Sequence, residues 1–335
     1  WPYRNLPYDD YIEVLDLLED ERRIWIDWED NKFGKRGFAQ MIYYTNIGTI
    51  APNNNYLVFT SDGTMVGQLS SSFVSSLRNG DVFLLGGSTY RVSSIRGTRV
   101  NVSPATGYRP TIPSWTGEAN SRTHELSQEV LELLEEVATY ARLEKDPMTI
   151  FTDILGLNRP VAHAVSGFFQ EHVATTFQVP SNDLILVEQV EAPLPTYIVT
   201  TCRGRAFNLA LGHLFAGIAT NDNIIVHELS FDENGFMIKL SHEVEISLIP
   251  EIFKQGNSKD VLQKHMMESQ LFAKRFREIS SRSMLNPRRI GAEEVSPKQF
   301  QQRAEQIMQK HRQMDDSVLI RETMNEILHA DLDMA

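Results

Sequence analysis

The sequence predicts a mixed α+β fold, and three observations carry this prediction. Between residues 46 and 117, the 335-residue chain shows short runs of alternating apolar and polar residues broken by Gly and Asn, which is typical of strands joined by turns. After residue 117 the apolar spacing becomes helical, with a few strand-like runs between the helices. From residue 258 onward only helical spacing is left. We therefore expect three domains, at residues 1–45, 46–117 and 118–335.

Residues 1–45 are expected to form the C-terminal part of a winged helix. Pro7 and Asp9 are typical of a helix start, and apolar residues repeat at helical spacing behind them. Residues 22–44 then predict a strand, a Gly-containing turn and a second strand, which together would be the wing. Because the chain starts at Trp1 rather than Met, within this domain, we expect a longer parent chain.

Two tryptophans and the cations of the wing are candidate nucleic-acid ligands. Trp25 is expected near the tip of the wing, with Lys35 and Arg36 on its turn, where a phosphate backbone could be contacted. A solvated turn is the alternative interpretation. Trp115 lies at the end of the second domain. It is predicted to plug the core there, with base stacking as the alternative.

Residues 46–117 are expected to form a small antiparallel β-barrel. Period-2 alternation places four apolar side chains on its inward face: Val82, Leu84, Val92 and Val100. Three arginines lie on the last two predicted strands: Arg91, Arg96 and Arg99. An outward row of arginines there would either line a nucleic-acid groove or solvate an exposed sheet face.

Residues 118–335 are expected to form an α+β domain that ends in a helical tail. Helices are predicted at 124–144, 161–176 and 205–220, and strands at 183–190, 196–201, 223–230 and 236–240. Three further helices, at 258–285, 297–311 and 317–329, would form the tail. These long charged helices could also present a surface for oligomers or repair partners.

Charge is distributed unevenly along the chain. The net charge of the whole is −12, whereas residues 271–312 hold ten Lys/Arg and four Asp/Glu, a local charge of +6. A basic face on an acidic protein can confine nucleic acid to one side. The candidate ligands in this segment are Lys274, Arg275, Arg282, Arg288 and Arg289, since a guanidinium fork matches phosphate. Salt bridges within the domain, favoured for Arg277, and docking onto motor domains are the alternatives.

Sequence motifs for nucleotide hydrolysis are missing. The chain has no G-x-x-x-x-G-K-[ST] loop, because its single Gly-Lys pair, Gly34-Lys35, is followed by Arg36, and it has no D-E-x-[DH] box. The nine histidines show no zinc spacing. We therefore expect no metal, no cofactor and no ATP hydrolysis in this chain.

The remaining reactive side chains favour structural roles. Cys202 and His213 could be regarded as a dyad, but a lone cysteine at a strand end is usually buried. A single cysteine and no long apolar run predict a cytoplasmic protein without a membrane span. The C-terminal carboxylates are expected to form a solvated face: Glu322, Glu326, Asp331 and Asp333.

Several stretches, in the same order, carry a resemblance to one family. They are the barrel-like residues 66–118 with the corner Pro-Ser-Trp, and YYTNIGTIAP, CRGRAFNLALGHLFA, DENGFMIKL, SQLFAKRFREISSRSML and RETMNEILHADLDM. Together they resemble the region that follows two RecA-like motor domains in the large helicase-related (Lhr) family of superfamily 2 helicases. The resemblance covers nearly the whole chain.

This resemblance implies a nucleic-acid-binding accessory region of an ATP-dependent DNA helicase, which grips the tracking strand behind the motor. ATP and Mg²⁺ would be bound only by the motor domains, and the partners would be those domains and single-stranded or forked DNA, with RNA open. Arg205 is a further candidate ligand, because a Gly-Arg turn starts a helix in this family. Family members mostly carry Phe-Gly-Arg-Arg there, so Arg203 and Ala206 depart from the pattern and one arginine is lost. Two alternative functions are a DNA glycosylase-like repair module and a protein-interaction platform.

Overall fold

The computed structural model divides the chain into two compact units. It describes residues 4–47, 56–107 and 121–332, except for 71–72, 75–76, 78, 97–98, 144, 177, 246–256, 292 and 315. One unit holds Trp1–Ala119 and Gln270–Glu326, and the other holds Asn120–Ser269 and Ile327–Ala335. The division into three domains stays a prediction. The two units group residues by contact, and residues 270–326 of the third predicted domain belong to the first unit.

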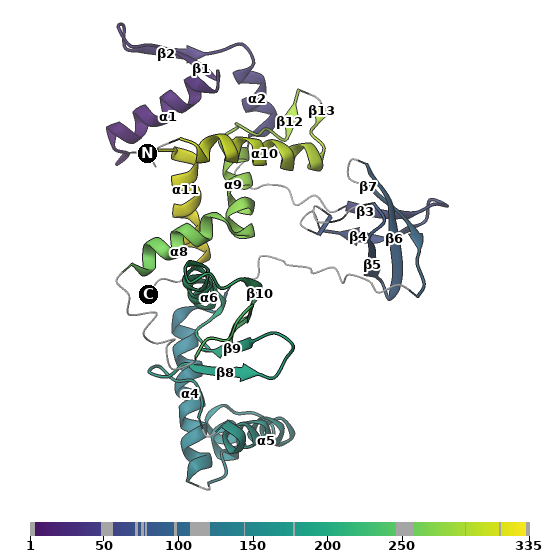
Figure 1. Ribbon diagram of the computed structural model, residues 1–335, viewed down its shortest axis with the longest axis vertical. Coiled ribbons are helices and arrows are strands. Elements are labelled where there is room, and N and C mark those ends of the chain that lie inside the picture. Colours follow the sequence, from purple (N-terminus) through teal and green to yellow (C-terminus); the bar gives the residue numbers. More distant parts are fainter. Residues whose placement is uncertain are drawn as a thin grey trace. The chain divides into compact units, whose positions relative to one another are not determined.

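A helix, a hairpin and a second helix open the first unit (Figure 1). Helix α1 covers Tyr8–Asp20, strands β1 (Ile24–Asp27) and β2 (Lys32–Lys35) pair antiparallel, and helix α2 covers Ala39–Asn46. The hairpin was predicted, but its turn is at residues 28–31, where the Asp27 carboxylate accepts hydrogen bonds from the backbone N–H groups of Glu29 and Asp30.

Three details of the predicted wing are therefore wrong. Gly34 lies in β2 rather than in the turn, because it pairs with Trp25, and a Cβ there would stand 2.7 Å from the indole ring. Lys35 ends β2 and Arg36 follows it, so neither lies on the turn. Residues 39–46 form α2 instead of continuing the second strand.

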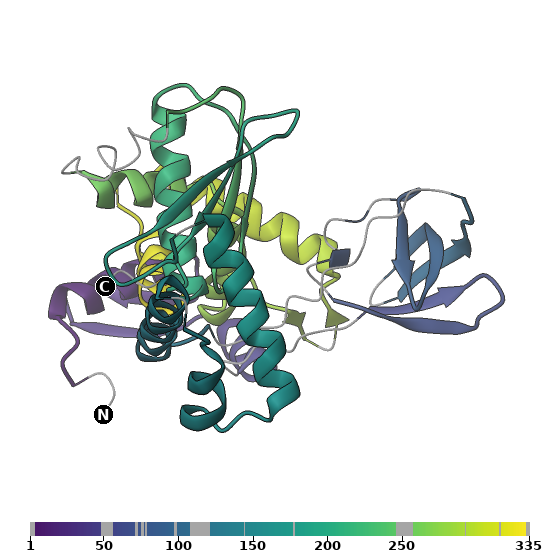
Figure 2. The same ribbon diagram turned by 90° about the horizontal axis from the view of Figure 1, so that it is seen from below.

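Five strands then form one curled sheet (Figure 2). They are β3 (Tyr56–Thr60), β4 (Met65–Leu69), β5 (Val82–Leu85), β6 (Ser88–Arg96) and β7 (Arg99–Pro104), and every one was predicted. Their order is β4-β3-β7-β6-β5, and the β3–β7 pair is parallel. The sheet is thus not antiparallel throughout, and among the described residues its two edge strands are unpaired with each other, so it is a half-barrel.

The interior of this sheet is apolar, as predicted, but one strand faces the opposite way. Val92 and Val100 are buried, whereas Val82 and Leu84 are only half-buried and Phe83 is fully buried in their place. The reason is register. Phe83 lies opposite Tyr90 on β6, two residues before Val92, so that all three side chains share the inward face.

Helices and a short hairpin complete the first unit. They are α9 (Gln270–Arg282), β12 (Arg289–Ile290), β13 (Glu293–Glu294), α10 (Pro297–Arg312) and α11 (Val318–Glu326). Helix α9 packs on α10 and α11, and α11 contacts α1. The predicted helix at 258–285 is two helices, since α8 (Ser258–Met267) belongs to the other unit and the chain passes between units at Ser269.

The second unit is the predicted α+β arrangement. Its helices are α4 (His124–Arg142), α5 (Arg159–Thr176), α6 (Arg205–Asn221) and α8, with π-helical turns at Ile150–Ile154 and Ile327–Asp331. Strands β8 (Leu186–Val190), β9 (Thr196–Thr200), β10 (Val226–Phe231) and β11 (Gly235–Leu240) form an antiparallel sheet of order β10-β11-β9-β8. Tyr197 and Ile238 of the sheet pack against Phe215 of α6 in the core. The mixed α+β prediction is confirmed.

In the part of the chain that the structure describes, no helix has both the length and the apolar character needed to cross a membrane.

Candidate nucleic-acid interface

The β1–β2 hairpin presents aromatic and basic side chains to solvent. Trp25 is 43% exposed and packs over Gly34, while Lys35 donates to the side chain of Gln40 and the Arg36 Nε donates to the Ile24 carbonyl at 2.7 Å. Three more aromatic side chains of this segment are exposed: Trp28, Phe33 and Phe38. Sequence reasoning missed these three, although their interleaving with charged residues is a visible signal for a nucleic-acid or protein contact.

The outer face of the five-stranded sheet brings two of the predicted arginines together. Arg96 and Arg99 are exposed and lie directly opposite each other on β6 and β7. Like charges in this position destabilise a sheet. Arg91 is half-buried and lies opposite Ser103, further along the same strand pair.

On the same face, Arg99 is held by its neighbours. The guanidinium carbon lies 3.8 Å from the centre of the Phe59 ring. Its Nε donates to the Asn101 side-chain oxygen at 3.0 Å, and the Asn101 amide donates to Ser94 Oγ at 3.0 Å. Of the three predicted arginines, Arg96 and Arg99 therefore lie together, and the orientation of the Arg99 side chain is fixed.

Ion pairs occupy the basic helix α9. Arg275 pairs with Glu278 at 2.8 Å and with Glu326 of α11 at 3.7 Å, and Arg282 also pairs with Glu326. Glu326 therefore does not belong to a solvated acidic face, as was expected, but joins α9 to α11. Arg277 is largely buried, and burial lowers its pKa against the opposing effect of Glu278. Lys274 is half-buried on the same helix.

A side-chain amide fixes the loop that carries Arg288 and Arg289. The Asn46 amide nitrogen donates to the Arg289 carbonyl and its oxygen accepts from the Arg289 N–H, both at 2.9 Å. These two bonds join the end of α2 to β12. The Arg289 residue is exposed, and the Arg288 guanidinium lies 5.1 Å from the Phe300 ring centre.

The Gly-Arg turn at the start of α6 is closed by a carboxylate of the protein itself. One Glu233 oxygen accepts from the backbone N–H of Arg205 at 3.0 Å and of Arg122 at 3.1 Å. The Arg205 side chain donates to the Phe231 carbonyl at 2.9 Å. A Cβ on Gly204 would stand 2.9 Å from the Arg122 carbonyl oxygen, so this turn requires glycine. The contacts of Arg205 thus hold the turn at the start of α6 against β10 and the turn after it.

The cysteine and histidines of the second unit form no nucleophilic pair. Cys202 is buried, which raises the pKa of its thiol and disfavours the reactive thiolate. The His213 ring packs against Phe231 and His265, at 5.3 and 5.4 Å between ring centres. Burial lowers the pKa of His213 to about 4. No group of three potential metal ligands occurs among the described residues.

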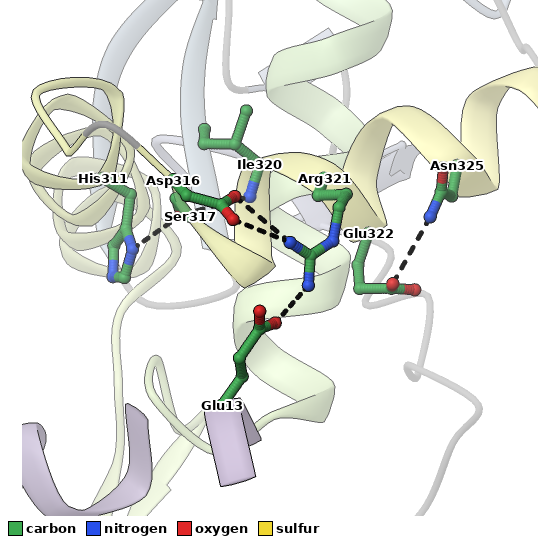
Figure 3. Close-up of polar contacts among 8 residues, drawn as sticks. All are labelled: Glu13, His311, Asp316, Ser317, Ile320, Arg321, Glu322 and Asn325. Carbon is green, nitrogen blue, oxygen red and sulfur yellow. Dashed lines mark hydrogen bonds and ion pairs between the residues drawn. The ribbon is translucent and has the colours of Figure 1, made fainter. Parts of the chain in front are cut away.

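A further cluster of polar contacts holds α1 against α11 (Figure 3). Arg321 donates to Glu13 of α1 and, at 3.1 Å, to Asp316. Its hydrogen bond to Glu13 raises the pKa of Arg321. Beside it, buried His311 contacts Ser317 Oγ at 2.9 Å through Nδ1. Sequence reasoning missed this cluster, because Glu13 is 308 residues away from Arg321.

Two predicted residues, Trp115 and Asp333, lie outside the described residues.

Two families match this chain. The family described as "Large helicase-related protein, winged helix domain" matches residues 1–112, and the family "DEAD/H associated" matches residues 179–335. The chain belongs to the large helicase-related (Lhr) family. The resemblance seen in the sequence is therefore confirmed.

Curated Lhr relatives match over the whole chain. "ATP-dependent helicase Lhr-Core protein 2" of Thermococcus barophilus is 30% identical over 349 residues, and "ATP-dependent helicase Lhr-Core" of Methanothermobacter thermautotrophicus is 31% identical over 352 residues. These alignments cover 100% and 99% of this chain and 40% of each relative. "Lhr helicase/uracil glycosylase" of Escherichia coli is 25% identical, over 98% of this chain and 22% of that protein. The chain thus spans less than half the length of the relatives that it matches.

A solved structure shares the fold. The Mycobacterium smegmatis helicase Lhr, bound to ssDNA and AMP-PNP, superposes with a TM-score of 0.67 at 20% identity, over 98% of this chain and 39% of that one. At this identity the likeness extends to the fold alone.

Proposed function

We propose that this chain is the nucleic-acid-binding accessory region of an Lhr-type ATP-dependent DNA helicase, and that it grips the tracking strand behind the motor. Membership of the Lhr family supports this proposal, as do the relatives named as ATP-dependent helicases. The missing phosphate loop supports a division of labour, in which RecA-like motor domains bind ATP and Mg²⁺ and this region binds the strand.

The outer face of the sheet is the observation that carries the proposal. Residues 56–107 contain four arginines and two aspartates, a net charge of +2 in a chain of net charge −12. Arg96 and Arg99 lie opposite each other and exposed. A phosphate bound between them would remove their mutual repulsion and release counterions from the strand. The hairpin with Trp25, Lys35 and Arg36 offers a second contact region of the same kind.

The basic helix α9 is a weaker candidate for nucleic-acid binding than the local charge of +6 indicated. Arg275 already pairs with Glu278 and Glu326, and Arg282 pairs with Glu326. The Arg205 side chain already donates to the Phe231 carbonyl. Binding of nucleic acid by the cations of α9 and of the loop after it stays a prediction.

Salt-dependent strand binding tests the proposal. Fluorescence anisotropy would measure the Kd of this chain for a labelled single strand between about 50 and 200 mM salt. We expect Arg96→Glu to weaken binding and to flatten the salt dependence by about 0.7 log units per lost phosphate contact. The matched control is Arg159→Glu, the same charge reversal at an exposed position of α5. Equal losses in the two variants, or no strand binding at all, would contradict the proposal. Parallel titrations with RNA and with forked DNA define the preferred substrate.

A DNA glycosylase-like module is the second candidate. It is favoured by relatives whose names include uracil glycosylase, although this chain covers only 22–23% of their length. Incubation of the chain with a uracil-containing strand, followed by alkaline cleavage at abasic sites, distinguishes the two. Cleavage that survives repurification and follows chain concentration would establish the second candidate.

A further inference from the structure

A preassembled stack of side chains lies on the outer face of the five-stranded sheet. Phe59 of β3 and Arg99 of β7 come from neighbouring parallel strands, and Phe59 is in register with Asn101. The guanidinium carbon of Arg99 is 3.8 Å from the centre of the Phe59 ring, the separation of a direct cation–π contact. One face of the guanidinium group is thus covered by an aromatic ring.

Hydrogen bonds fix the rotation of this guanidinium group. Its Nε donates to Asn101 Oδ1 at 3.0 Å, and Asn101 is itself held because its Nδ2 donates to Ser94 Oγ at 3.0 Å. A long arginine side chain on a sheet surface ordinarily samples many rotamers, and fixing it costs conformational entropy. Here the hydrogen bond to Asn101 orders the Arg99 side chain before any ligand binds, so ligand binding does not carry this entropy cost. The described residues provide no hydrogen-bond partner for the four remaining N–H groups of Arg99.

The surrounding charge favours an anionic ligand. Arg96 lies directly opposite Arg99. The two aspartates of residues 56–107 are Asp62, in the β3–β4 turn, and Asp81, just before β5, so neither lies on β3, β6 or β7. An exposed guanidinium plane beside a second arginine combines the two elements of single-strand recognition, which are a flat surface for a base and positive charge for the backbone.

We propose that one nucleobase of a bound single strand stacks on the exposed face of the Arg99 guanidinium, while Arg96 contacts the adjacent phosphate. Phe59 and Asn101 are positioning residues, since they hold the guanidinium plane without touching the strand. This inference rests on the proposed function and assigns to the sheet a base contact in addition to phosphate contacts.

Paired Arg→Lys variants separate stacking from charge. Lysine keeps the positive charge but has no planar group, so Arg99→Lys removes the stack alone, and Arg96→Lys is the matched control on the neighbouring strand. The probes are a labelled oligothymidylate and a strand of the same length whose central nucleotides are abasic. Both probes carry the same number of phosphates.

We expect the wild-type chain to bind oligothymidylate about tenfold more tightly than the abasic strand. Arg99→Lys should reduce this discrimination several-fold with an unchanged salt slope, whereas Arg96→Lys should retain it. Asn101→Ala should also reduce the discrimination while leaving the affinity for the abasic strand unchanged, a result that general damage to the sheet would not give. Thermal melts show that each variant is folded.

Three results would overturn the inference. If Arg99→Lys discriminates as well as Arg96→Lys does, no base stacks on Arg99, although strand binding and the proposed function stand. If the wild-type chain binds the two probes equally, the sheet contacts the backbone alone. If the wild-type chain binds neither probe, the proposed function fails together with this inference.

Discussion

Glu326 is predicted to clamp α9 to α11, and replacing it with glutamine tests whether the arginines of α9 stabilise the fold or bind nucleic acid. The side chains concerned are partly buried: Arg275 is 16% exposed, Glu326 26% and Arg282 38%. Glu326→Gln keeps the shape of the side chain but removes the charge that both arginines share. Its matched control is Glu322→Gln, one turn earlier on α11, where the carboxylate accepts a hydrogen bond from the Asn325 amide at 3.4 Å.

The expected loss follows from this burial. An exposed ion pair contributes about 0.2–1 kcal/mol, and partial burial of Arg275 places the two pairs toward the upper end. We expect Glu326→Gln to lower the free energy of unfolding by about 1–2 kcal/mol, and Tm by about 2–8 °C in a unit of this size. Glu322→Gln should change the free energy by less than about 0.5 kcal/mol.

The assay is a double-mutant cycle with Arg282→Gln, Glu326→Gln and the double variant, followed by urea unfolding. A coupling free energy of about 0.5–1 kcal/mol between the two positions is expected. The same proteins are titrated with a labelled single strand, whose affinity should stay within about twofold of wild type. Zero coupling would refute the clamp. A strand affinity that rises in Glu326→Gln, with a steeper salt dependence, would instead show that the released arginines bind phosphate.

Three further predictions concern activity, backbone packing and pH. The purified chain should show no nucleic-acid-stimulated ATP hydrolysis, and phosphate release that follows chain concentration through repurification would contradict this. Gly235→Ala should lower the free energy of unfolding by about 3 kcal/mol or more, because its Cβ would stand 2.1 Å from the Val199 carbonyl oxygen. Gly37→Ala, with no atom within 4 Å of the new Cβ, should change it by less than about 0.5 kcal/mol, and equal urea midpoints would refute the argument. Because burial lowers the pKa of His213 from 6.5 to about 4, the folded state binds fewer protons than the unfolded state between these values. Stability present above pH 6.5 should therefore fall by up to about 3 kcal/mol as pH drops to 4, and urea midpoints of His213→Asn should show a shallower fall.

The sequence alone determined the strands of the sheet and the absence of ATPase motifs. Each strand from β3 to β7 coincides with a predicted alternating run, because alternation of apolar and polar residues is a local property of a strand with one buried face. The sequence also placed Arg91, Arg96 and Arg99 on the last two strands, but the facing of Arg96 and Arg99 depends on the pairing of β6 with β7, which has a bulge between Val92 and Ser94. The family resemblance was likewise local, since each stretch that carried it is contiguous.

The tertiary structure decided what each charged or apolar side chain contacts. Phe83 faces inward because Tyr90 lies opposite it, and no property of β5 alone fixes that choice. Arg282 pairs with Glu326, 44 residues later in the chain. The backbone N–H of Arg205, at the start of α6, donates to the carboxylate of Glu233, 28 residues later. Periodicity predicts which face of an element is polar, but an ion pair depends on which element is packed against that face. The sequence therefore located the basic segment at 271–312, whereas only the packing of α11 on α9 showed that its charge is partly neutralised within the protein.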